Sequence, residues 1–220
     1  MKKIMKKHPI LAAFLFPVLI ILFTSILSDI LSQRIGDETL CYAIMRIITA
    51  LFLLLSFSAG KHPFPQKTGR GEREFSFLLP VGAIMAFNLI SAALAGAKTA
   101  PLATALLFSF APGIYEEVIY RRIVLQNLYN GFGEGKKAGW KAILISSASF
   151  GVIHLTNLPV LGLETTLIQI SYAFVIGLVF GAGYLRTESL PLLLSAHWGI
   201  DFTSQIFQTD DMGFTAGEKI

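Results

Sequence analysis

The sequence predicts an all-α membrane protein: a polytopic transmembrane helical bundle of about seven spans, within a range of roughly six to eight. Of its 220 residues, 54% are hydrophobic and only 15% are charged, and the mean hydropathy is +0.64. Several apolar runs approach or exceed the roughly 20 residues that a helix needs to cross the hydrocarbon core. Strand-like alternation of polar and apolar residues is absent, which favours helices over a barrel. The apolar excess must therefore face lipid.

Seven apolar segments underlie this prediction, and they cover residues 9–31, 40–59, 76–97, 101–129, 138–157, 163–186 and 189–208. The first is longer than the roughly 7–15 apolar residues of a secretory signal and has no clear small-residue cleavage site, so we interpret it as a retained transmembrane helix. The longest polar connection, 60–73, is rich in Pro, Gly and basic residues, as a solvated loop should be. We divide the chain into two N-terminal helices with this basic loop (1–75), a helical core (76–208) and a short polar tail (209–220).

The basic residues of the loops predict the orientation, because cytoplasmic loops carry the excess of Lys and Arg. With the N-terminus in the cytoplasm, the inner segments hold Lys2, Lys3, Lys6, Lys7, Lys61, Lys67, Arg70, Arg73, Lys136, Lys137, Lys141 and Arg186. The outer segments hold Arg34, Lys98 and Lys219. An odd number of spans then places the C-terminal tail outside. The net charge of +4 thus indicates topology and not nucleic-acid binding, and a lone cysteine excludes intramolecular disulfides and CxxC motifs.

Ionisable residues within three of the apolar segments call for an explanation, because each costs roughly 2.5–3.5 kcal/mol near the centre of a transmembrane helix. They are Glu116, Glu117 and Arg121 in the fourth segment, His154 in the fifth, and His197 and Asp201 in the seventh. A rise of about 1.5 Å per residue from the cytoplasmic ends puts Glu116 roughly 20 Å deep, His154 roughly 24 Å deep and the seventh-segment pair roughly 12–18 Å deep. With tilt and side-chain length allowed for, the acids and imidazoles can share one layer of the membrane.

A spacing of four residues places three pairs of these side chains each on one helix face. The pairs are Glu117 with Arg121, Phe150 with His154, and His197 with Asp201. In the first pair the acid precedes the base, which is the favourable order for an ion pair. In the second, an aromatic ring should lie one turn below the imidazole. Glu116 has no basic residue three or four positions away, so its carboxylate is the freer one.

These groups can support hydrolysis without a nucleophilic side chain. A carboxylate and an imidazole beside a confined water can act as general base and assisting group, and a second imidazole with a polar neighbour can stabilise an oxyanion. The sequence has no Gly-x-Ser-x-Gly elbow, and Cys41 should lie near the outer end of the second helix, away from the cluster. An activated water is therefore favoured over a serine or cysteine nucleophile.

Three motifs in order carry a family resemblance: Glu-Glu-x-x-x-Arg at 116–121, Phe-x-x-x-His at 150–154 and His-x-x-x-Asp at 197–201. With these motifs the chain resembles the CAAX-protease and bacteriocin-processing (CPBP, or Abi) family of intramembrane endopeptidases, over about residues 76–208. The resemblance implies an intramembrane protease that hydrolyses peptide bonds of membrane-associated proteins or peptides. Its partners would be membrane lipid and such a substrate, with no nucleic acid; the sequence indicates no oligomeric state.

The resemblance also implies a role for each motif residue. Glu116 would activate the water with His154 as its partner, and His197 and Asp201 would bind the oxyanion. Glu117 is the fifth predicted catalytic residue and would order the site together with Arg121 and Phe150. The last motif position is Asn or Asp in the family. Asp201 is the acidic variant, which is the poorer hydrogen-bond donor unless it is protonated.

A metal is the second possibility for the same residues. The family is often described as metalloproteases, and a metal-free glutamate mechanism has also been advanced for it. The sequence lacks His-Glu-x-x-His, so no short zinc motif decides between the two. We expect a metal-free site; if Zn²⁺ is required, its ligands would be Glu116, His154, His197 and Asp201.

Two functions from other classes stay open beside the protease. A proton-coupled transporter would also bury Glu, His and Asp, but it usually shows internal repeats, and none is visible here. A non-catalytic bacteriocin-immunity or scaffold protein would keep the fold without hydrolysis. Family members cleave prenylated CAAX segments in eukaryotes and are linked to bacteriocin maturation or self-immunity in bacteria. The small chain with its short basic N-terminus looks more like a multi-pass protein of a bacterial plasma membrane, so a prenylated substrate is disfavoured.

Overall fold

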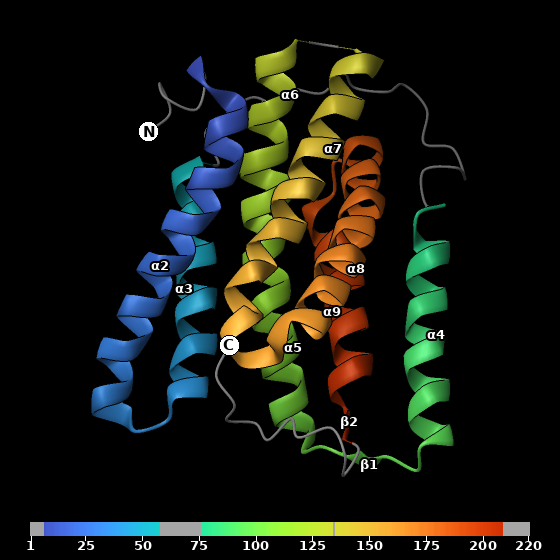
Figure 1. The fold of residues 1–220 in the computed structure, drawn as a ribbon. Helices are drawn as coiled ribbons and strands as arrows, with labels where there is room; N and C mark the ends of the chain where they lie inside the picture. Colours follow the sequence, from blue (N-terminus) through green and yellow to red (C-terminus); the bar gives the residue numbers. More distant parts are fainter. Residues whose placement is uncertain (1–6, 58–75, 134, 209–220) are drawn as a thin grey trace.

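The computed structural model describes residues 7–57, 76–133 and 135–208, and nearly all of them are helical. The elements are α2 (Pro9–Ile35), α3 (Glu38–Phe57), α4 (Leu78–Leu94), β1 (Lys98–Thr99), α5 (Leu102–Glu117), η2 (Val118–Leu125), α6 (Gln126–Phe132), α7 (Lys136–Ile153), η3 (His154–Asn157), α8 (Leu158–Thr187), α9 (Leu190–Gln205) and β2 (Phe207–Gln208). Figure 1 shows the long helices side by side, with α2 and α3 on one flank, α4 on the other and α5 to α9 between them. The all-α prediction is confirmed.

The first two helices form a hairpin whose turn follows from its sequence. Pro9 occupies the first turn of α2, where its missing N–H costs no hydrogen bond. Gly36 ends the helix in the left-handed conformation, with φ of 85°, and its N–H bonds to the Ser32 carbonyl at 2.7 Å. Asp37 then caps α3, because its Oδ1 accepts from the Leu40 N–H at 2.9 Å. The hairpin therefore begins α3 at Glu38, and Cys41 lies near this end of the helix, where it is fully buried.

A continuous helical rod from Leu102 to Phe132 crosses the middle of the molecule, and its central part is unusual. The eight residues of η2, Val118–Leu125, have the wider π-helical geometry, and all but Arg122 are buried. Segments of π-helix are rare and often lie at functional sites. Here the π-helix begins directly after Glu117 and contains Arg121.

The α7–α8 pair packs closely through small residues. A side chain on Gly177 would lie within 3.0 Å of the Ser147 Cα, and one on Gly181 within 3.2 Å of Ile143 Cγ2. The Gly177–Gly181 stretch is therefore the small-residue packing face that its GxxxG spacing predicts. Such close contact lets α7 and α8 lie against each other with their backbones near contact distance.

The boundary between α7 and α8 differs from the sequence prediction. Instead of ending at 157, α7 ends at Ile153 and continues as the 3₁₀ turn η3. Instead of starting at 163, α8 starts at Leu158, and Gly162 interrupts it with φ of 73°, which only glycine adopts readily. Apolarity continues through this bend, so hydropathy alone could not locate it.

The ends of α5 and α9 are joined by a small β-ladder that a purely helical prediction does not contain. Lys98 and Thr99 pair antiparallel with Gln208 and Phe207. At its other end, α9 is capped by Ser189, whose hydroxyl accepts from the Leu192 N–H at 3.3 Å. The ladder thus ties the start of α5 to the end of α9.

Four stretches are long and apolar enough to cross a membrane: Pro9–Ile35, Glu38–Phe57, Leu102–Phe132 and Lys136–Thr187, the last of which contains both α7 and α8. All seven predicted segments contain a helix, but α4 has only 17 residues and α9 only 16. The membrane class is therefore confirmed and the count of seven spans is not. Large apolar side chains such as Leu55, Leu79 and Leu94 are more than three-quarters exposed, as lipid-facing residues are.

Candidate active site

Helices α5 and α9 bring four of the five predicted catalytic residues into contact. Glu116 and Glu117 are the last two residues of α5, and His197 and Asp201 lie one turn apart on α9. His197 is the centre of the group. Its Nδ1 is 2.9 Å from Glu117 Oε1, and its Nε2 is 3.7 Å from Glu116 Oε2 and 3.6 Å from Asp201 Oδ2.

Glu117 joins two positively charged or polar partners in the interior. Its second oxygen, Oε2, accepts from Arg121 Nε at 3.2 Å, and neither side chain is exposed. The ion pair predicted from the spacing of these two residues is thus present. The guanidinium also lies over two rings, 5.3 Å from the centre of Phe150 and 5.9 Å from that of Phe180. These contacts stabilise a buried cation whose two terminal nitrogens have no hydrogen-bond partner among the described residues.

The bond to Glu117 determines how the His197 ring is used. An ionised carboxylate only accepts hydrogen bonds, so Nδ1 carries the proton that is shared with Glu117. Nε2 is then the nitrogen presented to Glu116 and Asp201, whose side chains are about one-fifth exposed. The accessible side of the cluster therefore consists of one imidazole nitrogen and two carboxyl groups.

His154 takes a different position from the other four. It is the first residue of the turn η3, and its Nδ1 lies 2.8 Å from the Phe150 carbonyl. Because a carbonyl only accepts, the neutral ring leaves Nε2 as an acceptor. In the described part of the chain His154 has no hydrogen bond or ion pair with Glu116, His197 or Asp201.

Phe150 connects His154 to the cluster through its ring. The centre of the Phe150 ring is 5.2 Å from that of His154 and 6.3 Å from that of His197, both in edge-to-face geometry. Phe180 lies 5.4 Å from His197 on another side. The predicted aromatic ring below the imidazole is thus present, and it forms part of an apolar wall around both histidines.

The possible zinc ligands can be tested against the geometry. Among residues 7–57, 76–133 and 135–208, no three His, Cys, Asp or Glu side chains are placed to hold a metal ion. One nitrogen of His197 is bonded to Glu117, and one nitrogen of His154 is bonded to the Phe150 carbonyl. The arrangement does not present the four groups to one point, so we derive no chemical step through a metal.

Two features of the site were not predicted from the sequence. The Glu117–His197 bond joins residues that are 80 positions apart in the sequence, and no local sequence pattern predicts such a contact. Arg46, inside α3, lies with its Cζ 5.9 Å from the centre of the Tyr115 ring, next to Glu116 in the chain. The sequence does indicate this residue, because an arginine within an apolar run is as costly in the membrane as the acids are.

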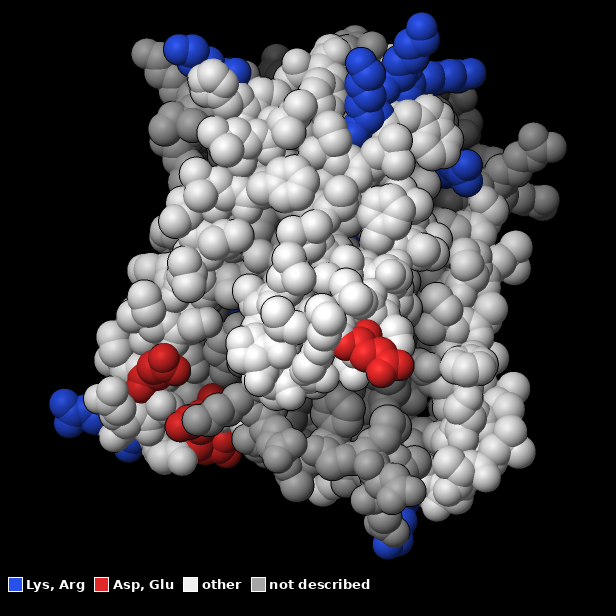
Figure 2. Space-filling view, viewed as in Figure 1, with Lys and Arg blue, Asp and Glu red and all other residues white. Residues whose placement is uncertain are grey.

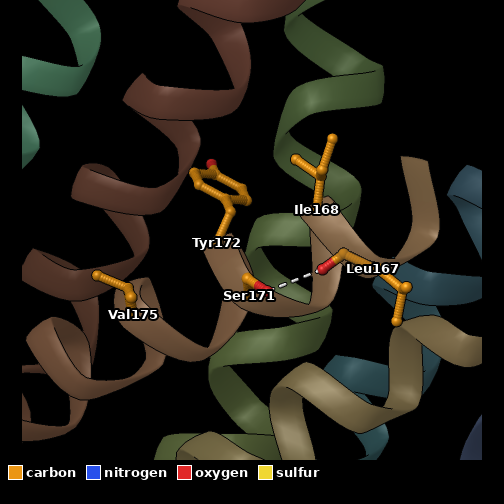
Figure 3. A pocket seen from close by; sticks show the side chains of 5 residues that line it. All are labelled: Leu167, Ile168, Ser171, Tyr172 and Val175. Atoms are coloured by element: carbon orange, nitrogen blue, oxygen red, sulfur yellow. Dashed lines mark hydrogen bonds between the residues drawn. The ribbon is translucent and has the colours of Figure 1, made fainter. Parts of the chain in front are cut away.

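A shallow groove lies outside this cluster, on the exposed face of α8. Its volume is about 570 Å³, and it is lined by Leu167, Ile168, Ser171, Tyr172 and Val175. Figure 3 shows these side chains along one stretch of the helix, with the Ser171 hydroxyl bonded to the Leu167 carbonyl at 2.9 Å. The lining contains no acid or imidazole, so the groove supplies no catalytic group of its own.

Together, the fold and the cluster define a helical membrane protein with a buried carboxylate–imidazole site. The family model described as "Type II CAAX prenyl endopeptidase Rce1-like" matches residues 98–203, a range that contains all three motifs. No curated protein and no solved structure matches the chain. The match to the family model confirms the resemblance seen in the sequence and supports a CAAX-type intramembrane protease at the level of the family.

Proposed function

We propose that the protein hydrolyses peptide bonds of membrane-associated proteins or peptides with a water molecule activated by Glu116 and His154. The observation that carries this proposal is the convergence of Glu116 and Asp201 on one nitrogen of His197, at 3.7 and 3.6 Å. Such a site offers a proton acceptor beside groups that can stabilise negative charge, which are the two requirements of peptide hydrolysis.

Glu116 is the carboxylate best suited to act as the base. Glu117 is fully buried and already holds Arg121 and His197. Glu116 remains about one-fifth exposed, and among the described residues its carboxylate has no hydrogen bond and approaches His197 Nε2 at 3.7 Å. It takes a proton from water while the water oxygen forms a bond to the carbonyl carbon of the substrate. His154, with Nε2 as an acceptor, helps to orient that water.

His197 and Asp201 would stabilise the negative oxygen that this attack produces. Glu117 fixes the His197 ring, so a protonated Nε2 can donate to the oxyanion; a protonated Asp201 can do the same. When the tetrahedral intermediate collapses, its C–N bond breaks, and the proton held by Glu116 passes to the leaving amine. All atoms of water are then found in the two products, and the site returns to its starting state.

The environment of the reaction follows from the distribution of charge. Figure 2 shows most of the visible Lys and Arg at the upper end of the molecule, a few at the lower end, and the visible Asp and Glu in the lower half. The basic end includes the start of α7, with Lys136 and Lys137. We therefore place this end in the cytoplasm and propose seven spans in a bacterial plasma membrane, with the substrate reaching the site from the lipid. A prenyl group on the substrate is not required by any contact described above.

The test compares membranes that contain the wild-type protein with membranes that contain Glu116→Gln. Peptidomics should find cleavage products in the first that are missing from the second. Glu164→Gln is the matched control, because it makes the same change at an exposed position of α8. If Glu116→Gln yields the wild-type set of products, the protease proposal is wrong and a scaffold role is favoured. If purified protein in liposomes carries a proton flux but cleaves no peptide, a transporter is favoured instead.

A further inference from the structure

Arg46 is a cation in the middle of an apolar helix, and the hydrolytic mechanism does not use it. It is the ninth of the 20 residues of α3, whose hydropathy is that of a transmembrane helix. An arginine at such a depth costs roughly 2.5–3.5 kcal/mol by insertion measurements. Intramembrane charges are retained at this cost mainly where they serve a function, so Arg46 calls for a partner.

The surroundings of Arg46 supply aromatic faces and no acid. Its Cζ lies 4.3 Å from the centre of the Tyr42 ring, one turn earlier on α3, and 5.9 Å from that of Tyr115 on α5. In the described chain Nε is buried without a hydrogen-bond partner, and no carboxylate lies within ion-pair distance of the guanidinium. Two rings stabilise the cation in part, and its donors remain available to an anion.

The position of Tyr115 places this cation at the active site. The Tyr115 hydroxyl is bonded to Thr24 at 3.0 Å, which fixes the ring between α2, α3 and α5. Tyr115 directly precedes Glu116 at the end of α5, and Arg46 lies within electrostatic range of Asp201. Arg46 therefore lies near the active site, on a helix that packs against α5.

We propose that Arg46 binds a carboxylate of the peptide substrate and thereby positions the scissile bond beside Glu116. An arginine binds a carboxylate through two parallel hydrogen bonds, and such bonds are strong where water is excluded. A peptide in the membrane can bring this group as its C-terminal carboxylate or as an Asp or Glu side chain. Glu116 and Asp201 would repel a substrate carboxylate placed beside them. Arg46 would instead bind that carboxylate away from the two acids, while the scissile bond lies next to Glu116.

This inference rests on the proposed function for its substrate, but it can be tested by binding alone. The probe is a peptide taken from a cleavage site found in the membrane peptidome, made with a C-terminal carboxylate and with a C-terminal amide. A third version replaces any Asp or Glu by Asn or Gln. Binding is measured to purified Glu116→Gln protein in liposomes, which should not cleave the probe.

Charged hydrogen bonds contribute about 1.5–3 kcal/mol, so the acid peptide should bind about 10- to 100-fold more tightly than the version without the recognised carboxylate. Adding Arg46→Gln should reduce this ratio to about one, and Arg46→Lys should retain part of it. Arg34→Gln, which removes an exposed arginine at the end of α2, should leave the ratio intact.

Two results would overturn the proposal. One is equal binding of all peptides by Glu116→Gln protein with Arg46 intact. The other is a preference for the carboxylate that survives Arg46→Gln, which would place its recognition elsewhere and leave Arg46 as a structural cation. Failure of the protease proposal is a separate outcome: Glu116→Gln would then cleave the acid peptide as fast as the wild-type protein, whatever the binding ratio.

Discussion

At the scale of single residues, His197 is the side chain on which the site converges. Glu117 holds its Nδ1 at 2.9 Å, while Glu116 and Asp201 approach its Nε2. The two adjacent glutamates consequently differ in burial and in their partners. Glu117 is a buried structural anion between His197 and Arg121, and Glu116 is the accessible one. Replacing each by glutamine should have different effects on stability.

Glu117→Gln should lower both stability and activity. It leaves the buried Arg121 without its counter-charge and weakens the bond that orients His197. Removing one partner of a buried pair costs about 3–5 kcal/mol, whereas Glu116→Gln should leave the melting temperature near that of the wild type. Thermal unfolding of both variants in detergent measures this difference. A stable Glu117→Gln protein beside an unstable Glu116→Gln protein would reverse the assignment.

The contacts of the site show what the sequence could predict. Glu117 with Arg121 and His197 with Asp201 follow from the four-residue spacing, because a helix fixes such pairs locally. The Glu117–His197 bond depends on how α5 and α9 pack, and no local pattern contains that information. His154 belongs to the turn η3 and not to α7, which ends one residue before it, and continuous apolarity conceals this boundary in the sequence.

At the scale of elements, the position of His154 depends on how α7 and α8 pack. Gly177 faces Ser147, seven residues before His154 on the other helix. A methyl group at Gly177 would lie 2.9 Å from Ser147 Cβ and 3.0 Å from its Cα, closer than carbon atoms approach. The helices must therefore separate before any side chain fits at this position.

Gly177→Ala should for this reason destabilise the protein, by about 1–3 kcal/mol as overpacking does, and should lower activity through the displaced α7. Gly82→Ala on α4 is the matched control, since nothing lies within 4 Å of the added methyl group. That variant should be neutral or slightly stabilising, because alanine favours a helix more than glycine does. Melting temperatures of the two variants test the contact. Equal melting temperatures would show that α7 and α8 do not pack as closely as described.

At the scale of the whole molecule, composition predicts the class correctly, and hydropathy finds a helix in each of the seven segments. Hydropathy does not settle the number of spans, because α4 and α9 are short and α7 and α8 are joined through a bend. The proposed orientation rests on the charge of the loops, and two exposed polar residues at opposite ends of the bundle allow it to be tested. These are Gln33, near the end of α2, and Asn130, on α6.

Single cysteines at these positions should react differently with an impermeant maleimide. In a Cys41→Ser background, Gln33→Cys should be labelled in intact cells, and Asn130→Cys only after the membrane is opened. Native Cys41 is fully buried and is a poor reporter of either side. Labelling of Asn130→Cys in intact cells would show that the orientation is reversed.

Whether the protease needs a metal ion is tested on the whole protein, because chelation removes metal from every site at once. A site that works through Glu116 and His154 should retain proteolysis after exhaustive chelation of the purified protein. The measurement is the rate of peptide cleavage before and after chelation, with Zn²⁺ added back. Activity that disappears on chelation and returns with one equivalent of zinc would favour the metal-dependent alternative.

The central claim is that Glu116 drives hydrolysis in an otherwise intact fold. Its most direct test is the rate of peptide-bond cleavage by purified wild-type and Glu116→Gln protein, reconstituted in liposomes with the same substrate. General-base catalysis contributes about 10²- to 10⁴-fold, so the variant should lose at least about 100-fold in kcat while its melting temperature stays near that of the wild type. A folded Glu116→Gln protein that cleaves at the wild-type rate would contradict the account.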